Sequence, residues 1–167
     1  MIVREALLEE LPFIRVQRVR SYQEHAERIP EEHWKALKRA ISSEADMHPG
    51  VDRLVAEIDG AIVGSVVLFP AKTDAYEGFA EQLEYPEIRM LAVTPETRGK
   101  GVAKALITEC IKIAKARGFQ SIGLHTGDFM VNAMNLYEHL GFKRLPEFDF
   151  IPADDGIVVK AYRLVFK

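Results

Sequence analysis

The chain has 167 residues, of which 48% are hydrophobic and 28% charged, so it has the composition and size of one globular domain whose core needs neither disulfides nor a structural metal. A formal net charge of -3 argues against a general nucleic-acid binder, which would carry an excess of Lys and Arg. The single cysteine, Cys110, excludes an intrachain disulfide and suits a reducing compartment.

The first fifty residues predict one short strand followed by two helices. "IVREAL" is typical of a strand, and a helix is expected over about residues 8–26, where apolar side chains recur at three- and five-residue steps. Pro30 suits a first helical turn, and the segment "EEHWKALKRAI" after it places Trp34, Leu37 and Ile41 on one helix face.

The remaining segments alternate between strand and helix patterns. In "RLVAEIDGAIVGSVVLFP", two β-branched runs flank Asp59 and Gly60, the pair that best supports a type I′ hairpin. The strand "IRMLAV", a helix ending at Gly118, the strand "SIGLHT", a helix ending at Gly141, and the strands "GFKRL" and "GIVVKAYRLVF" follow. This order predicts a mixed α/β single domain over residues 1–167, with a partly antiparallel sheet.

Two glycines lie where the strand "IRMLAV" gives way to a long helix. A helix N-terminus presents unpaired N–H groups and positive dipole, so Gly99 and Gly101 predict an anion site, most naturally for phosphate, although a plain turn is the alternative. A Walker loop is excluded because Lys100 is followed by glycine instead of Ser or Thr. A dinucleotide fingerprint is disfavoured because Lys104 stands at the third glycine position.

The segment from Arg98 to Ala103, "RGKGVA", resembles the R-x-x-G-x-G/A signature of the GNAT superfamily of N-acetyltransferases. "PEIRMLAV" is similar to the central strand of that family, and "AMNLYEHLGF" to its second coenzyme A motif, A-x-x-L-Y-x-x-x-G-F. The resemblance extends from about residue 53 to the C-terminus. It implies a mixed, partly antiparallel central sheet flanked by helices on both faces, and acetyl-CoA as acyl donor.

The resemblance also implies which residues hold coenzyme A. The strand splays from its neighbour and pairs with the pantetheine arm, while the glycine turn takes the diphosphate. Met130 stands where the family often has asparagine. Asn132 and Asn135 are nearby but out of register, and Asn132 is the candidate retained. The expected cofactor residues are Leu91, Ala92, Val93, Arg98, Gly99, Lys100, Gly101, Val102, Ala103 and Asn132. For Lys100 and Lys104 a solvated basic face is the alternative.

Acyl transfer to an amine needs a base, an acid and an oxyanion donor. An alkylamine titrates near 10.4 and arrives mostly protonated, so a general base helps. By resemblance Glu87 is that base, Tyr137 returns a proton to the thiolate, and a backbone N–H near Leu91 faces the thioester oxygen. The alternatives are that Glu87 pairs with Arg89 or solvent and that Tyr137 is a core residue. A bulge of the kind the family carries would reset the alternation that otherwise puts Glu87 and Leu91 on one face.

The expected function is an acetyl-CoA-dependent N-acetyltransferase that acts on a primary amine by direct attack in a ternary complex. The alternative is a non-catalytic acyl-CoA sensor or regulatory module of the same fold. An acidic stretch before the central strand favours a cationic acceptor. The alternative is that these side chains form the solvent-exposed face of a short helix. The acidic residues are Asp74, Glu77, Glu81, Glu84 and Glu87.

Further partners are limited by the same sequence. The five histidines show no metal spacing, and Cys110 and His125 are expected to be packed residues. The apolar C-terminal strand could pair with a second copy to form a homodimer. No apolar run approaches the ~18 residues of a membrane span, and the N-terminus lacks a signal-peptide pattern, so a cytoplasmic protein without nucleic-acid or membrane partners is expected.

Overall fold

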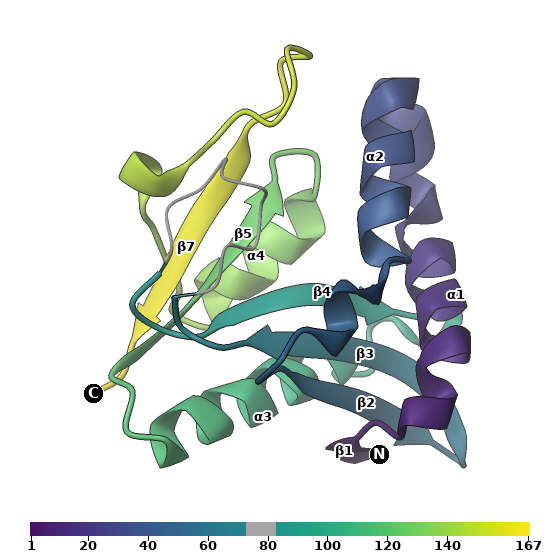
Figure 1. Cartoon of the computed structure of the whole chain (residues 1–167), viewed down its shortest axis with the longest axis vertical. Helices are drawn as coiled ribbons and strands as arrows, with labels where there is room; N and C mark the ends of the chain where they lie inside the picture. The colour runs from purple at the N-terminus through teal and green to yellow at the C-terminus, as the bar shows by residue number, and fades with distance from the viewer. Residues whose placement is uncertain (73–82) are drawn as a thin grey trace.

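The computed structural model describes residues 1–72 and 83–167, which fold around one seven-stranded sheet (Figure 1). The strand order is β1-β2-β3-β4-β5-β7-β6, and within it only β4 and β5 are parallel neighbours. This confirms the expected partly antiparallel α/β fold. The strands are β1 Ile2–Glu5, β2 Asp52–Ile58, β3 Ala61–Phe69, β4 Glu87–Val93, β5 Ser121–Gly127, β6 Lys143–Arg144 and β7 Val159–Val165.

Helices cover both faces of the sheet, as expected (Figure 1). Side chains of α3 and α4 share one apolar cluster, whereas α1 and α2 pack on the opposite face. The helices are α1 Leu11–Tyr22, α2 Glu31–Ile41, α3 Val102–Ala116 and α4 Val131–His139. The helix expected over residues 8–26 is shorter than predicted, because 3-10 turns at Leu8–Glu10 and Gln23–Arg28 flank α1.

The β2–β3 connection is the tight hairpin that its sequence predicts. Asp59 and Gly60 both have positive φ, 52° and 79°, the combination that a type I′ turn requires. Within the described ranges, no helix is long and apolar enough to cross a lipid bilayer.

The α3 face of the sheet is held by apolar packing. Leu106, Ile107 and Cys110 are fully buried in a cluster that also contains strand residues from β2 to β5. Burial raises the pKa of the Cys110 thiol to about 12, which confirms its expected role as a packed residue. Gly64 on β3 lets the helix approach closely, since a Cβ there would lie 2.6 Å from Val102 Cγ1.

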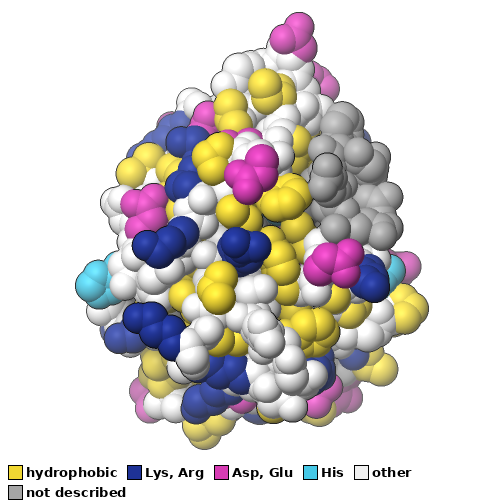
Figure 2. Space-filling view, turned by 90° about the vertical axis from the view of Figure 1, so that its left-hand side faces the viewer, with side chains coloured by type: hydrophobic (Ala, Val, Ile, Leu, Met, Phe, Trp, Pro, Cys, Tyr) yellow, Lys and Arg dark blue, Asp and Glu magenta, His cyan; other side chains and the backbone are white. Residues whose placement is uncertain are grey.

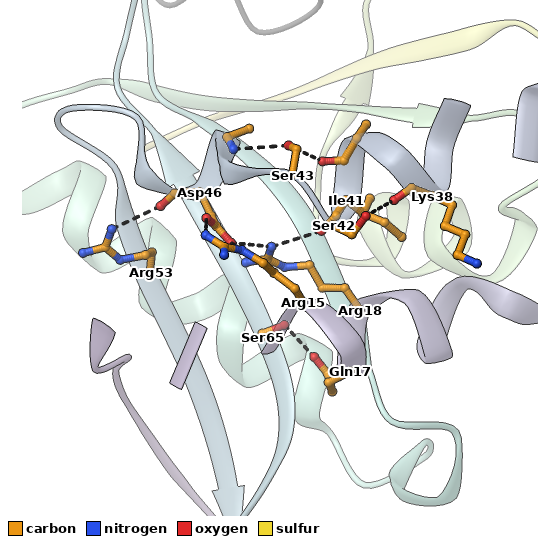
Figure 3. A network of polar contacts seen from close by, with 12 residues as sticks. Arg15, Gln17, Arg18, Lys38, Ile41, Ser42, Ser43, Asp46, Arg53 and Ser65 are labelled. Carbon is orange, nitrogen blue, oxygen red and sulfur yellow. Dashed lines mark hydrogen bonds and ion pairs between the residues drawn. The ribbon is translucent and has the colours of Figure 1, made fainter. Parts of the chain in front are cut away.

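The α1 face has two smaller apolar clusters and, in addition, a group of buried polar side chains (Figure 3). Arg18 on α1 and Asp46, in the 3-10 turn Glu44–Met47, are both almost completely buried, and their side chains approach to 2.8 Å. Arg15 reaches the other carboxylate oxygen of Asp46, also at 2.8 Å. Next to them the Ser65 hydroxyl donates to Gln17 Oε1 at 2.8 Å and so joins α1 to β3. The periodicity of apolar residues predicted none of these contacts.

The C-terminal strand β7 lies near one end of the sheet, with only the two-residue β6 beyond it. Figure 2 shows this side of the molecule, where hydrophobic, basic and acidic side chains are mixed. Val165 at the end of β7 is exposed. Pairing of β7 with a second copy of the chain stays a prediction.

Candidate functional site

The parallel strands β4 and β5 pair over a short distance and then diverge (Figure 1). Their register contains only two pairs, Glu87 with Gly123 and Ile88 with Leu124. Beyond that point β4 stays with β3, where Ala92 pairs with Ser65. Among residues 1–72 and 83–167, the C-terminal half of β4 therefore has a strand neighbour on one side only, as the expected splay requires.

A β-bulge lies in the same half of β4. Arg89 pairs with Val67 and Ala92 with Ser65, so Met90 and Leu91 together oppose one residue of β3. Met90 has a φ of 57°, which turns the chain locally out of the ladder. The expected bulge is thus confirmed, and the alternation is reset: Arg89 lies over the Phe69 ring on the α1 face, whereas Leu91 packs toward α3.

Main-chain direction along β4 favours some of the expected cofactor residues over others. The Thr94 N–H donates to the Val63 carbonyl at 2.8 Å, so by alternation Ala92 also faces β3 and Val93 faces away from it. The Leu91 carbonyl accepts a hydrogen bond from the Tyr22 hydroxyl at 2.8 Å. The Val93 carbonyl accepts a hydrogen bond from the Arg98 guanidinium at 3.3 Å, so Val93 is better placed than Ala92 to offer its N–H, but not its carbonyl, to a ligand.

The glycine turn after β4 leads directly into α3. Gly99 and Gly101 both have a φ of 80°, a left-handed conformation that favours glycine, and no atom lies within 4 Å of a Cβ built on either. Backbone conformation, and not close packing, is therefore what favours glycine at both positions. No side chain of the described residues caps α3, and the first main-chain bond into the helix runs from the Ala105 N–H to the Gly101 carbonyl.

The N–H groups of residues 99–104 have no main-chain acceptor in the described part of the chain. Several of them lie at the N-terminus of a 15-residue helix, where the helix dipole adds positive potential. Consecutive unpaired donors at the positive end of a helix dipole are the features that favour an anion. The expected residues Gly99, Lys100, Gly101, Val102 and Ala103 are all brought to this turn.

Arg98 has a different position from its neighbours in the motif. Its guanidinium donates to the Ser21 carbonyl at 2.8 Å and forms an ion pair with Glu24, so the side chain fastens the turn to the end of α1 and the 3-10 turn after it. Its main-chain N–H bonds the Pro95 carbonyl at 3.4 Å. Lys104 and Asn132 are exposed, and their roles stay predictions.

Tyr137 on α4 is buried between two aromatic rings. Its ring centroid lies 6.0 Å from that of Phe142 and 6.2 Å from that of Tyr162. Burial raises the pKa of Tyr137, and negative charge on Tyr22 would raise it further, so the phenol stays protonated at neutral pH. The packed residue and the proton donor are therefore compatible roles for the same side chain.

Glu87 is buried at the point where β4 and β5 part. Its Oε1 lies 3.1 Å from His125 Nδ1, and His125 Nε2 lies 3.2 Å from the Phe148 carbonyl oxygen. The alternative that Glu87 points to solvent is wrong, because the residue is only 5% exposed. His125 is a hydrogen-bonded strand histidine, as expected, but its partner could not be found without the register of β4 on β5.

The acidic stretch is described only in part. Asp74, Glu77 and Glu81 lie outside the described residues. Glu84 lies inside them, exposed, with its carboxylate 3.6 Å from Lys72 Nζ. In residues 1–72 and 83–167, no group of three His, Cys, Asp or Glu side chains could hold a metal ion.

Comparison with known proteins agrees with this geometry. The model of the "Acetyltransferase (GNAT) family" matches residues 11–142. Over 90 residues, 54% of the chain, the sequence is 34% identical to human N-acetyltransferase 8B. That match spans only 37% of the human protein.

Solved structures extend the similarity of fold to nearly the whole chain. A GNAT acetyltransferase from Streptococcus agalactiae superposes with a TM-score of 0.74 at 16% identity, covering 99% of this chain and 95% of that one. A PaiA N-acetyltransferase from Thermoplasma acidophilum, solved in complex with coenzyme A, gives 0.68 at 20% identity, with 99% and 98% covered.

Proposed function

Because the chain belongs to the acetyltransferase (GNAT) family, we propose that it transfers an acetyl group from acetyl-CoA to a primary amine by direct attack in a ternary complex. The observation that carries the proposal is the junction of β4 and α3. There a bulged strand that has parted from β5 leads into a helix N-terminus whose N–H groups have no side-chain cap or main-chain acceptor in the described part of the chain. Residues 1–167 act as one acetyltransferase domain in this proposal.

The residues present fit two parts of coenzyme A, its diphosphate and its pantetheine arm. Unpaired N–H groups from Gly99 to Lys104 would take the diphosphate, and exposed Lys100 and Lys104 would add positive charge. Main-chain groups of Leu91 and Val93 would pair with the pantetheine arm as an added strand does, and Asn132 is a further candidate. Acetyl-CoA would supply an activated thioester, and these residues would hold that thioester in place.

Two buried side chains would manage protons in this proposal. Tyr137 remains a phenol at neutral pH because burial raises its pKa, so it can donate to a leaving thiolate. Glu87 would take a proton from the incoming amine, which arrives mostly as an ammonium ion. A backbone N–H at the bulge near Leu91 would stabilise the oxyanion.

The proposal has three further parts. The acceptor amine is cationic, the protein is cytoplasmic, and two copies pair along β7. The acidic composition of residues 74–87 supports a cationic amine through favourable electrostatic potential. The single, buried cysteine suits a reducing compartment.

Turnover separates this function from that of an acyl-CoA sensor of the same fold. Thiol release from acetyl-CoA is measured with a panel of polyamines, amino sugars and peptide amines. We expect turnover with at least one amine, and a fall in kcat of roughly 10²-fold or more in Glu87→Gln and in Tyr137→Phe. Coenzyme A binding without turnover on any amine would favour the sensor, and a thermal shift with ATP but not with coenzyme A would contradict both.

A further inference from the structure

The buried pair of Glu87 and His125 lies beside the last paired residues of β4 and β5. Glu87 is opposite Gly123, and His125 follows two residues later on β5, so both side chains point to the same face of the sheet. The His125 side chain is 1% exposed and that of Glu87 7%. The Phe150 ring covers the imidazole with its centroid 5.4 Å away.

Both ring nitrogens of His125 face oxygen atoms that accept hydrogen bonds. The carbonyl of Phe148 lies 3.2 Å from Nε2, and Glu87 Oε1 lies 3.1 Å from Nδ1. A neutral imidazole carries one N–H, which satisfies only one of these contacts. If that hydrogen is on Nε2, the Nδ1 lone pair faces a carboxylate oxygen unless a second proton lies between them.

We propose that Glu87 and His125 share one proton in addition to the single N–H of a neutral imidazole, and that His125 thereby positions Glu87 as a base that gains and loses this proton. The catalytic role of the pair rests on the proposed function, whereas the number of protons that the pair holds does not depend on it. With the shared proton, the buried pair is either an imidazolium with a carboxylate or a neutral imidazole with a carboxylic acid. Either form has zero net charge, which favours burial.

Charged and titratable groups surround the pair on several elements. Burial raises the pKa of Tyr85, and the nearby charge of Glu87 raises it further. Asp149 also lies close enough to interact electrostatically with His125. Arg89 is on the same face of β4, two residues after Glu87. The remaining described charged groups of this neighbourhood are Arg163 and Glu147, which act on Tyr85, and Arg144, which pairs with Asp149.

The pair exists in a form with the shared proton and a form without it, and only the second can act as a base. When an ammonium substrate arrives, one of its N–H bonds breaks and that proton joins the pair, which only the form without the shared proton can accept. The nitrogen lone pair then bonds the acyl carbon, and the C–S bond breaks with its electrons on sulfur. The Tyr137 hydroxyl protonates that sulfur, and the second proton leaving the nitrogen restores the phenol.

A second histidine–carboxylate pair in the chain serves as a control. His33 Nδ1 lies 2.7 Å from Asp155 Oδ2. His33 Nε2 has no acceptor in the part of the chain that the structure describes. One N–H on Nδ1 therefore satisfies this pair, and the geometry requires no extra proton.

Nuclear magnetic resonance of protein labelled with 15N-histidine and 13C-carboxyl glutamate counts the protons directly. In the wild type at pH 7 we expect either a His125 with both nitrogens protonated or a Glu87 carboxyl with the shift of the acid. Glu87→Gln should leave a neutral His125 with its hydrogen on Nε2, because the new amide N–H can donate to Nδ1. Asp155→Asn should leave the resonances of His125 unchanged. A neutral His125 beside an ionised Glu87 in the wild type would overturn the proposal.

Kinetics give a second readout once an acceptor is known. His125→Gln should lower kcat at pH 7 by roughly tenfold, a fraction of what a general base contributes, with an unchanged KM for acetyl-CoA and a displaced pH profile. Asp155→Asn should leave the profile in place. An unchanged kcat profile in His125→Gln contradicts the positioning role. Absence of turnover in the wild type contradicts the proposed function. The number of protons on the pair is then tested by the nuclear magnetic resonance experiment alone.

Discussion

The helices on both faces of the sheet pack through apolar side chains, but only the α1 face, among the described residues, adds a buried ion pair. On one face, α3 packs through a continuous apolar stripe against β2 to β5, and Gly64 allows it to approach closely. On the other, α1 packs through the buried Leu11 and Ile14 and is also bonded through Arg18 and Gln17, whose buried side chains contact Asp46 and Ser65 (Figure 3). Apolar contacts tolerate substitutions of similar volume, whereas a buried charge depends on its one partner. The α1 face should therefore be the more sensitive of the two to single polar substitutions.

The largest expected effect follows from removing the charge at the centre of the α1 network. Asp46→Asn leaves the buried guanidinium of Arg18 without its carboxylate, and we expect the free energy of unfolding to fall by about 3–5 kcal/mol. Urea unfolding followed by circular dichroism measures the difference. A loss below about 1 kcal/mol would mean that the two faces do not differ in this way.

The same carboxylate makes stability depend on pH. Burial alone would raise the pKa of Asp46, but hydrogen bonds from Arg15 and Arg18 outweigh it and lower the pKa below its usual value. The stabilisation is therefore complete above the unfolded pKa of about 3.9 and is lost as the pH falls through the lower folded value. Unfolding measured between pH 6 and pH 2 should show a shallower acid slope in Asp46→Asn than in the wild type. Parallel slopes would contradict this role of Asp46.

A smaller effect is expected for overpacking on the apolar face. Gly64→Ala places a Cβ 2.6 Å from Val102 Cγ1, and we expect a loss of about 1–3 kcal/mol of unfolding free energy. Val102→Ala removes the atom that would clash, so the double variant should be more stable than the sum of the two single losses predicts. Strictly additive losses in urea unfolding would show that the contact does not limit the approach of α3.

The smallest effect is expected for an exposed ion pair. Arg117 Nη1 lies 2.7 Å from Asp52 Oδ2, as close as the buried pair, but the arginine side chain is 46% exposed. Arg117→Gln should cost no more than about 1 kcal/mol in urea unfolding. A loss as large as that of Asp46→Asn would show that distance, and not burial, decides the contribution of such pairs.

Local patterns in the sequence predicted the elements and the glycine turn. The segment "EEHWKALKRAI" predicted α2, which spans Glu31–Ile41, because its apolar face and the preceding proline are local signals. The Asp59–Gly60 turn was predicted for the same reason. The expected helix over residues 8–26 was too long, because one period of apolar residues does not distinguish α from 3-10 geometry at the ends.

Contacts between distant residues were outside the reach of such patterns. Glu87 and His125 are 38 residues apart in sequence and meet only because of the parallel register of β4 on β5. Arg18 and Asp46 are 28 residues apart, and neither residue has a local signal of burial. Motifs therefore located the glycine turn, whereas the polar partners of α1 and of Glu87 could be found only from the fold.

Calorimetric titration of coenzyme A tests the central claim, that main-chain N–H groups of the glycine turn hold its diphosphate. Gly101 and Gly60 offer a matched pair, because their φ angles are 80° and 79° and neither has an atom within 4 Å of an added Cβ. Alanine at either position should cost a similar 1–2 kcal/mol of stability, roughly. We predict that Gly101→Ala weakens coenzyme A binding about tenfold or more, or ~1.4 kcal/mol, while Gly60→Ala binds like the wild type. Equal affinities in all three proteins, or no binding to the wild type, would contradict the account.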